Sequence, residues 1–194
     1  MQKGKYILIF ILFQVSVFAQ NLDYKITFIG FDIGSFSVKQ KKDNNKLTII
    51  VDGQGVINML KSYIIKFYSK SVFGNNKLIS AISYRYQNGE KTDSVFVEKK
   101  IYAYKIFSFD DGERYVSDIK NTGNMLYFNE PFDNQEIFSE NKGRFITIKK
   151  IGEHKYFSYD EKKGEKITYE YKNNLLIRTI FERGFVTLTM KLKQ

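Results

Sequence analysis

Two carboxylates, Glu130 and Glu140, are the residues with the strongest claim to chemistry in this chain. They lie in a stretch that also holds several aromatic rings and the only proline, Pro131. Two carboxyl groups about 5–10 Å apart can serve as acid and base in the hydrolysis of a polymer. Irregular segments carried by a rigid scaffold are also common binding sites, so Tyr127 joins the two glutamates as a candidate ligand contact. The favoured alternative is structural: Phe132, Ile137 and Phe138 plug one end of a barrel.

Most other catalytic chemistry is excluded by residue type. The chain has no cysteine and one histidine, so it offers neither a thiolate nucleophile nor a zinc site of several Cys or His ligands. His154 stands in a predicted turn, where we expect a surface side chain without a catalytic role. Asp110–Glu113 lacks the ligand spacing of a calcium loop, and Gly53-Gln54-Gly55 lacks the third glycine of a phosphate-binding loop. The sequence therefore predicts no catalytic residue, metal or cofactor, and a protein that is not an enzyme.

Aromatic content gives the clearest indication of a ligand. Phe and Tyr make up 16% of the chain, and Tyr84/Tyr86 and Tyr102/Tyr104 each place two rings on one face of a predicted strand. Rings on a concave sheet can hold a lipid tail or another apolar small molecule, so Tyr84 and Tyr102 complete the candidate ligand-binding set. Core packing and cross-strand pairing are the alternative explanation.

Strands must position all of these residues. Apolar and polar side chains alternate with period two in runs such as Tyr24–Phe28, Ile167–Tyr171 and Val186–Leu192, which is typical of half-buried strands. Short turn sequences separate the runs, and neighbours so close in sequence must pair antiparallel. These turn sequences are Asp43-Asn44-Asn45, Gly74-Asn75-Asn76, Asn88-Gly89, Asp111-Gly112, Lys163-Gly164 and Asn173-Asn174. We predict an all-β fold of about 12–14 short strands in one strongly curved or barrel-like sheet.

Two places break the alternation. The parity of apolar residues switches near Gly30 and Gly34, which predicts a β-bulge that bends the sheet. Residues 131–143 contain two glutamates four apart and end in Gly143, which predicts a short helical turn or long loop.

The N-terminus predicts export. Lys3 and Lys5 precede an apolar run from Tyr6 to Phe13, and Val17-Phe18-Ala19 offers a cleavage site. This pattern is typical of a signal peptide over residues 1–19, cleaved after Ala19. The run is shorter and more polar than the roughly 20 residues of a membrane anchor. We therefore expect one mature domain, residues 20–194, in the periplasm or outside the cell, and its lack of cysteine excludes disulfides.

The net charge of +10 is spread along the chain, largely as lysine pairs in predicted turns: Lys41-Lys42, Lys99-Lys100, Lys149-Lys150 and Lys162-Lys163. Solvated turns explain most of this charge. Peripheral contact with an anionic envelope surface is the second explanation, and export argues against nucleic acid as a partner. A transmembrane β-barrel is disfavoured because its lipid-facing band would carry charges.

Three segments carry a resemblance to known proteins: the opening strand pair, Tyr24–Val38, and the later patterns Tyr-Phe-x-Glu-Pro at Tyr127–Pro131 and Phe-Ser-Glu-x-x-Gly at Phe138–Gly143. In these segments the chain resembles a family of exported all-β Gram-negative proteins of unknown function. The resemblance implies an exported single-domain all-β protein and brings no activity, cofactor or partner. We therefore expect a non-enzymatic envelope module that binds an apolar or lipid-like ligand, in an interior that is lined by Phe, Ile and Tyr and opens at one end. The alternative is a structural or interaction module without a cavity.

Overall fold

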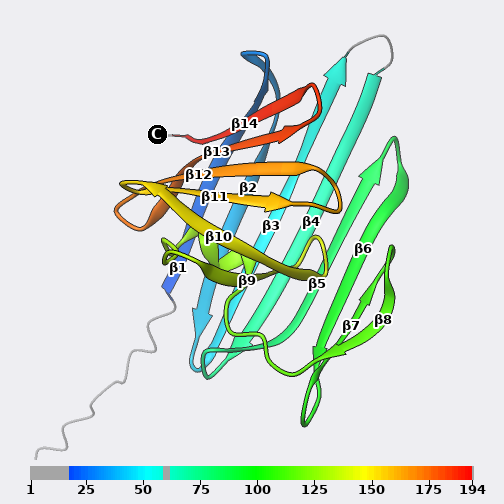
Figure 1. Ribbon diagram of the computed structural model, residues 1–194, viewed down its shortest axis with the longest axis vertical. Coiled ribbons are helices and arrows are strands. Elements are labelled where there is room, and N and C mark those ends of the chain that lie inside the picture. The colour runs from blue at the N-terminus through cyan, green and yellow to red at the C-terminus, as the bar shows by residue number, and fades with distance from the viewer. Residues whose placement is uncertain (1–17, 59–61, 194) are drawn as a thin grey trace, which may run out of the picture.

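The computed structural model describes residues 18–58 and 62–193 and places them in one antiparallel sheet of fourteen strands (Figure 1). The sheet order is β8-β7-β6-β5-β4-β3-β2-β1-β14-β13-β12-β11-β10-β9. The strands are β1 (Phe18–Phe28), β2 (Phe31–Asp43), β3 (Lys46–Asn58), β4 (Ser62–Gly74), β5 (Lys77–Gln87), β6 (Glu90–Lys99), β7 (Tyr104–Ser108), β8 (Gly112–Val116), β9 (Gln135–Ser139), β10 (Arg144–Gly152), β11 (Lys155–Asp160), β12 (Glu165–Lys172), β13 (Leu175–Arg183) and β14 (Val186–Leu192). The predicted fold class and strand number are confirmed.

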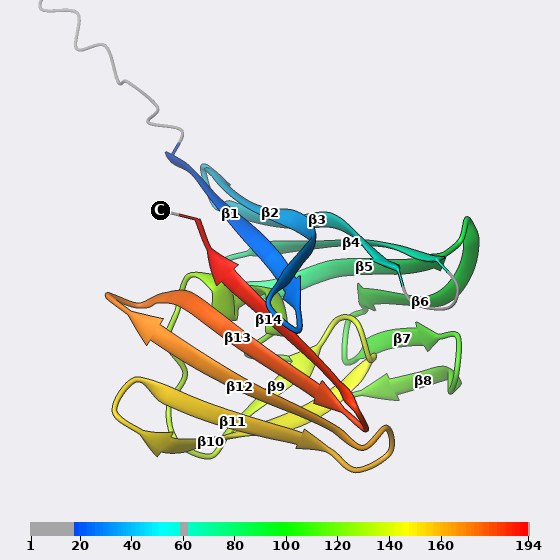
Figure 2. The ribbon, with the colours of Figure 1, turned by 90° about the horizontal axis from the view of Figure 1, so that it is seen from above.

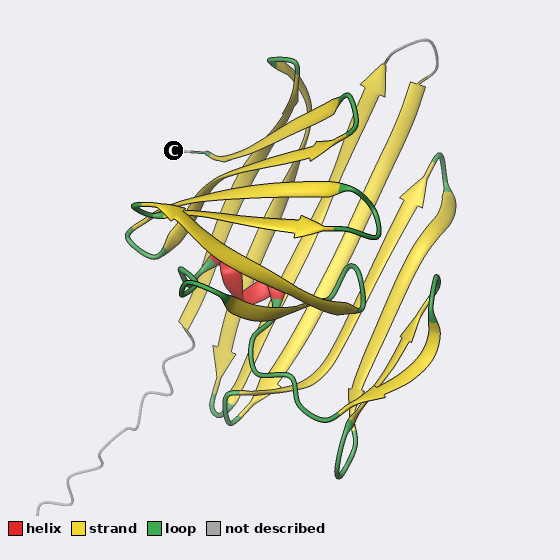
Figure 3. Cartoon of the chain, in the orientation of Figure 1, coloured by secondary structure: helices red, strands yellow, loops and turns green. Residues whose placement is uncertain are grey.

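The sheet bends until its two halves face each other. Figure 2 shows β2–β6 along one side and β10–β13 along the other, with β1 and β14 connecting them. A 3-10 helix, η1 (Gly123–Tyr127), lies between the two layers (Figure 3) and contacts β3, β9 and β13. The buried apolar residues between the layers form two clusters, and Tyr127 of η1 packs against both.

Aromatic rings occupy the space between the layers. Tyr24 on β1 and Phe36 on β2 stack with ring centroids 4.6 Å apart. Tyr127 from η1 packs edge-on against both, at 5.6 Å and 5.9 Å. In the other layer, Phe138 is fully buried against Phe145 at 5.4 Å. Pairs of this geometry add about 0.5–1.5 kcal/mol each beyond the area they bury.

Gly53 on β3 makes this packing possible. A Cβ atom at position 53 would lie 2.2 Å from Phe36 Cβ and 2.8 Å from the Phe67 ring. No other residue type fits there without moving the Phe36 backbone and the Phe67 ring, so glycine is required for close approach.

The predicted bulge is confirmed at Ile33. Ile26 pairs with Gly34 and Thr27 pairs with Asp32, which leaves Ile33 as the extra residue on β2. A bulge increases local twist and bends the strand. This one lies near the β1–β2 turn, in the central strands that connect the two layers.

The helical turn lies earlier in the chain than predicted. The helix η1 ends at Tyr127, whereas residues 131–143 contain the strand β9 and the turn to β10. Glu136 and Glu140 are spaced as on a helix, but pairing of β9 with β10 decides the conformation, with Phe138 opposite Phe145. Of the predicted plug residues, Ile137 and Phe138 are buried and Phe132 is exposed.

The predicted leader falls almost entirely outside the described residues. Its last two residues, Phe18 and Ala19, continue β1 and pair with Lys42 and Lys41. Within the described ranges, the chain forms no helix that is long and apolar enough to span a membrane.

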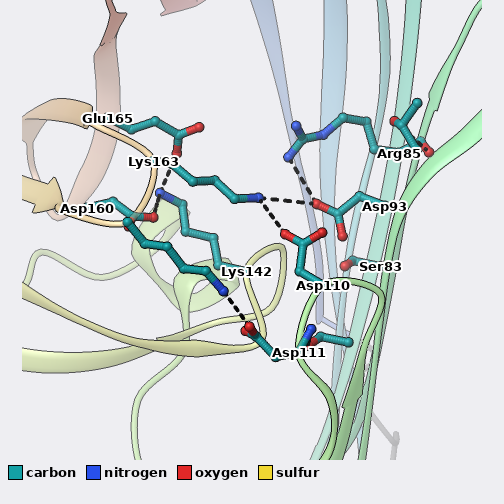
Figure 4. Close-up of polar contacts among 12 residues, drawn as sticks. Ser83, Arg85, Asp93, Asp110, Asp111, Lys142, Asp160, Lys163 and Glu165 are labelled. Atoms are coloured by element: carbon teal, nitrogen blue, oxygen red, sulfur yellow. Dashed lines mark hydrogen bonds and ion pairs between the residues drawn. The ribbon is translucent and has the colours of Figure 1, made fainter.

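Ion pairs hold the β11–β12 turn against strands from the opposite half of the sheet (Figure 4). Lys163 Nζ lies 3.3 Å from Asp110 in the β7–β8 turn and 3.7 Å from Asp93 on β6. Lys162 pairs with Asp111. This lysine pair, predicted only as a charged turn, thus joins the two layers.

A second group of ions lies beside this contact. Lys142 Nζ is 2.6 Å from Asp160 and 2.5 Å from Glu165, and Arg144 Nη2 donates to both Asp160 oxygens at 2.6 and 2.7 Å. Burial alone would raise the pKa of Asp160. The hydrogen bonds and charges of Arg144 and Lys142 outweigh burial and lower that pKa to about 2. These contacts fix the β9–β10 turn to the end of β11.

Candidate functional site

The five predicted ligand-binding residues do not form one site. Tyr127 packs in the core, Glu140 is buried beside β4, and Glu130 contacts the β10–β11 turn. Tyr84 points outward from β5, where its ring meets Phe96 at 5.6 Å. Tyr102 lies in the β6–β7 turn with 91% of its surface exposed.

The expectation that Tyr102 and Tyr104 share one face of a strand is wrong. The strand β7 begins only at Tyr104, whose ring is buried and whose hydroxyl donates to the Leu78 carbonyl at 3.0 Å. Tyr102 precedes the strand and projects into solvent. Alternation holds only inside a paired strand, so it does not extend to a residue in the turn.

Glu140 lies in a buried polar cluster. Ser71 Oγ donates to Glu140 Oε1 at 2.8 Å, and the Asn124 backbone N–H is 3.2 Å from both carboxyl oxygens. Burial raises the pKa of Glu140, and these hydrogen bonds oppose that shift only in part. Thr122 Oγ1 is also buried and has no hydrogen-bond partner among the described residues.

The same cluster joins η1 and the end of β9 to the layer formed by β2–β6, which we call the first layer. Asn124 Nδ2 donates to Ser69 Oγ at 2.9 Å and to Ser71 Oγ at 2.8 Å, while Ser83 Oγ donates to the Glu140 backbone carbonyl at 2.8 Å. The residues concerned come from β4, β5 and η1. Because these groups are buried and mutually hydrogen-bonded, the cluster fixes one arrangement of the two layers.

Glu130 has a different setting. Its carboxylate accepts a hydrogen bond from Tyr156 Oη at 2.7 Å and lies 2.9 Å from His154 Nδ1. Burial and this carboxylate raise the pKa of Tyr156 to about 12. His154 is exposed in the β10–β11 turn, as predicted, with a backbone φ of 54°. Its contact with Glu130 was not predicted, because the two residues are 24 positions apart.

The two carboxylates therefore do not present a hydrolytic pair. Glu140 is sealed from solvent and cannot reach a polymeric substrate. Glu130 is engaged by Tyr156 and His154, whereas Glu140 is engaged by Ser71 and Asn124. An acid and base that act on one bond must converge on it. In the described residues, no group of three His, Cys, Asp or Glu side chains is placed to hold a metal ion.

A groove on the outer face of β4–β7, with a volume of about 420 Å³, is the better candidate site. We call it the outer groove and define it by Lys70, Val72, Ile82, Phe96, Lys105 and Phe107. On β6, Val95 and Val97 point into the core, so the residue between them, Phe96, points out. Direct cross-strand pairing of Ile82 with Phe96, and of Phe96 with Phe107, lines up the apolar floor.

Aromatic rings extend this floor along the sheet. Phe96 and Phe107 have centroids 6.3 Å apart and are 38% and 44% exposed. Tyr84 packs edge-on against Phe96, and Lys91 Nζ lies 4.7 Å above the Tyr84 ring. Tyr84, predicted to line a concave sheet, thus lies on the outer face instead. The ligand itself stays a prediction.

Charged groups border the groove. Lys105 is paired with Glu113 at 2.8 Å, and Glu98 is paired with Lys100 at 2.7 Å. Lys70, directly across from Ile82, has no ion-pair partner among residues 18–58 and 62–193. The groove thus combines an apolar floor with one available cation at its border, an arrangement suited to an anionic amphiphile.

Two further depressions lie elsewhere on the surface. One is polar and bordered by Asp52, Gln54 and Lys66. The other, of about 710 Å³, lies at the β6–β7 turn beside Ile101 and Tyr102.

A family described as a domain of unknown function, DUF6134, matches residues 24–193. The chain belongs to this family. No protein of curated function matches the sequence. The family assignment thus agrees with the resemblance inferred from Tyr24–Val38 and Tyr127–Gly143 to proteins of unknown function.

Two solved structures align with most of the chain. A beta-barrel-like protein of the domain of unknown function DUF1849 from Brucella abortus aligns with a TM-score of 0.58 at 8% identity, over 90% of this chain and 95% of that chain. A DUF1089 family protein from Pseudomonas aeruginosa aligns with a TM-score of 0.34 at 9% identity, over 95% of this chain and 98% of that chain. The first supports a barrel-like fold, in agreement with the curved sheet.

The outer groove could be predicted from the sequence only in part. Phe96 lies between two apolar valines, so the run Val95–Val97 does not reveal which side faces out. Phe107 likewise directly follows the apolar residue Ile106, so the sequence does not show which of the two faces solvent. The adjacent aromatic rings of the groove depend on the strand register, which places Phe96 opposite Phe107.

Proposed function

We propose that this protein is an exported, non-enzymatic module that binds an apolar or lipid-like ligand in the outer groove. The observation that carries the proposal is the exposed pair Phe96 and Phe107 beside a volume of about 420 Å³. Sites for small ligands typically have volumes of about 300–1,000 Å³ and mainly apolar walls. The signal-peptide pattern of residues 1–19 supports export.

The proposed ligand lies in the groove and not in the interior, where it is expected from the sequence. Rings from both layers and from η1 occupy the space that an internal ligand would need, with Phe138 fully buried and Tyr24 stacked on Phe36. An outward floor of Ile82, Phe96 and Phe107 is accessible without any movement of the core. An acyl chain lying across these three residues would remove their exposed apolar surface from water, which favours binding.

Binding of a fluorescent fatty acid, cis-parinaric acid, tests the proposal. Its emission should rise on addition of the protein, and Phe96→Ala should weaken binding by about tenfold, equivalent to removing roughly 1.4 kcal/mol of apolar contact. Phe185→Ala removes an equally aromatic and fully exposed side chain from the β13–β14 turn and should bind as the parent does. Absence of an emission rise, or equal affinity of the Phe96 variant, would contradict the proposal.

A module that acts only through surface interactions is the second candidate, and the packed interior favours it. Native mass spectrometry separates the two functions. A bound apolar molecule of defined mass supports the ligand-binding module, whereas a ligand-free chain captured with a protein partner supports the interaction module.

A further inference from the structure

Three hairpin turns meet at one end of the first layer. The β2–β3, β4–β5 and β6–β7 turns all lie at the lower end of the molecule in Figure 1. Lys46 pairs with Gly74, and Gly74 pairs with Lys77, so the first two turns are adjacent. The Asn75 N–H also donates to the Asn45 carbonyl at 3.3 Å. Since neighbouring strands are about 4.8 Å apart, the three turns together span roughly 20–25 Å.

This end is basic, because its exposed lysines outnumber its exposed carboxylates, Asp43 and Glu98. It presents six exposed lysines, Lys41, Lys42, Lys46, Lys77, Lys99 and Lys100, and we call this set the basic end. Of the six, only Lys100 takes part in an ion pair within the described ranges, with Glu98 at 2.7 Å. Two lysine pairs that are distant in sequence are thus brought to one surface by the antiparallel register.

An apolar tip projects from the same end. Ile101 and Tyr102, at the β6–β7 turn, are 86% and 91% exposed and border the depression of about 710 Å³. Both residues directly follow Lys99 and Lys100. An aliphatic and an aromatic side chain held in water by a tight turn contribute nothing to the core, so they point to a contact outside the molecule.

We propose that the basic end docks on an anionic lipid bilayer, with Ile101 and Tyr102 entering the interfacial region. Lysines near an anionic leaflet each strengthen binding by about fivefold. Tyrosine suits the headgroup level because its ring is apolar and its hydroxyl remains hydrated. A soluble polyanion would need the lysines but would have no use for the Ile101–Tyr102 tip. That tip therefore favours the bilayer.

Tryptophan fluorescence offers a direct test, because the chain contains no tryptophan. Tyr102→Trp introduces a single reporter at the tip. Its emission should shift to the blue with vesicles of phosphatidylcholine and phosphatidylglycerol, and remain unshifted with phosphatidylcholine alone. Phe185→Trp is the matched control, since position 185 is fully exposed in the β13–β14 turn at the upper end in Figure 1. It should show no shift with either vesicle.

Charge variants in the Tyr102→Trp background complete the test. Lys99→Ala with Lys100→Ala should weaken binding to the anionic vesicles by about 25-fold. Lys149→Ala with Lys150→Ala removes the same charge from β10 and should leave binding unchanged. An unshifted Tyr102→Trp reporter, an equal shift with neutral vesicles, or binding to heparin without vesicle binding would each overturn the proposal. Phe96→Ala should bind vesicles normally, so failure of the outer groove and failure of the basic end are distinguishable.

Discussion

Replacing Asp160 by asparagine is expected to destabilise the fold by about 2–3 kcal/mol at neutral pH. Asp160 is 7% exposed, and the Arg144 and Lys142 cations lower its pKa from the ordinary value of 3.8 to about 2. Since one pKa unit corresponds to about 1.4 kcal/mol, the ionised carboxylate stabilises the native state by roughly 2 kcal/mol. The variant also leaves Arg144 without its carboxylate, which adds to the loss. Lys142 keeps its partner Glu165 at 2.5 Å.

The sign of the pH dependence follows from the lowered pKa. Stability from Asp160 is fully present above pH 3.8 and is lost as the pH falls through about 2. Urea unfolding of the parent and of Asp160→Asn, at pH values from 7 down to 2, measures the stability that Asp160 contributes and how that contribution depends on pH. The difference between the two proteins should be largest at neutral pH and should shrink between pH 4 and pH 2.

A matched control separates burial from ion pairing itself. Asp32 makes a pair of similar length, 2.7 Å from Lys25 Nζ, but its side chain is 60% exposed. Exposed pairs contribute about 0.2–1 kcal/mol, so Asp32→Asn should cost less than 1 kcal/mol. If Asp160→Asn is as stable as the parent at pH 7, or if its deficit persists unchanged to pH 2, the reasoning about this cluster is refuted.

Three other perturbations have defined outcomes. Glu140→Gln should become more stable relative to the parent as the pH rises above about 4.5. Burial raises the pKa of Glu140, so ionisation of this carboxyl group in the parent lowers the free energy of unfolding. Equal pH profiles of the two proteins in urea unfolding would contradict this. Gly53→Ala should lower the free energy of unfolding by about 1–3 kcal/mol through its clash with Phe36, and a normal thermal midpoint would argue against the close approach. Lys70→Gln should weaken cis-parinaric acid binding in the outer groove while leaving binding of a long-chain alcohol unchanged, whereas equal losses for both ligands would exclude a carboxylate contact at Lys70.

Local chemistry made the strands and turns predictable. Asn44, Asn75, Asn76 and Asn174 adopt the positive φ angles that tight turns require, and all four belong to turn sequences recognised in advance. The slip in apolar parity near Gly34 likewise located the bulge at Ile33. These features depend on residues close in sequence, which is why a single sequence reveals them.

Contacts across the bend could not be predicted in the same way. Lys163 meets Asp93, and Ser71 meets Glu140, only because the sheet brings its two halves together. Neither pairing leaves a periodic signal, since it depends on the accumulated curvature of many strands. The helical turn was misplaced for a related reason, because the pairing of β9 with β10 outweighs the helix-like spacing of two glutamates.

The pairing of the first strand with the last constrains how the polypeptide can assemble. Among the fourteen strands, β1 is synthesised first and its neighbour β14 last, and the β1–β14 pairing joins the two consecutive blocks of hairpins into one sheet. Each block can form from pairings between strands that are close in sequence, whereas β1 can pair with β14 only after β14 has been synthesised. A circularly permuted gene that fuses the natural ends and opens the chain between β8 and β9 would turn this late seam into a local hairpin, and we expect such a protein to fold faster.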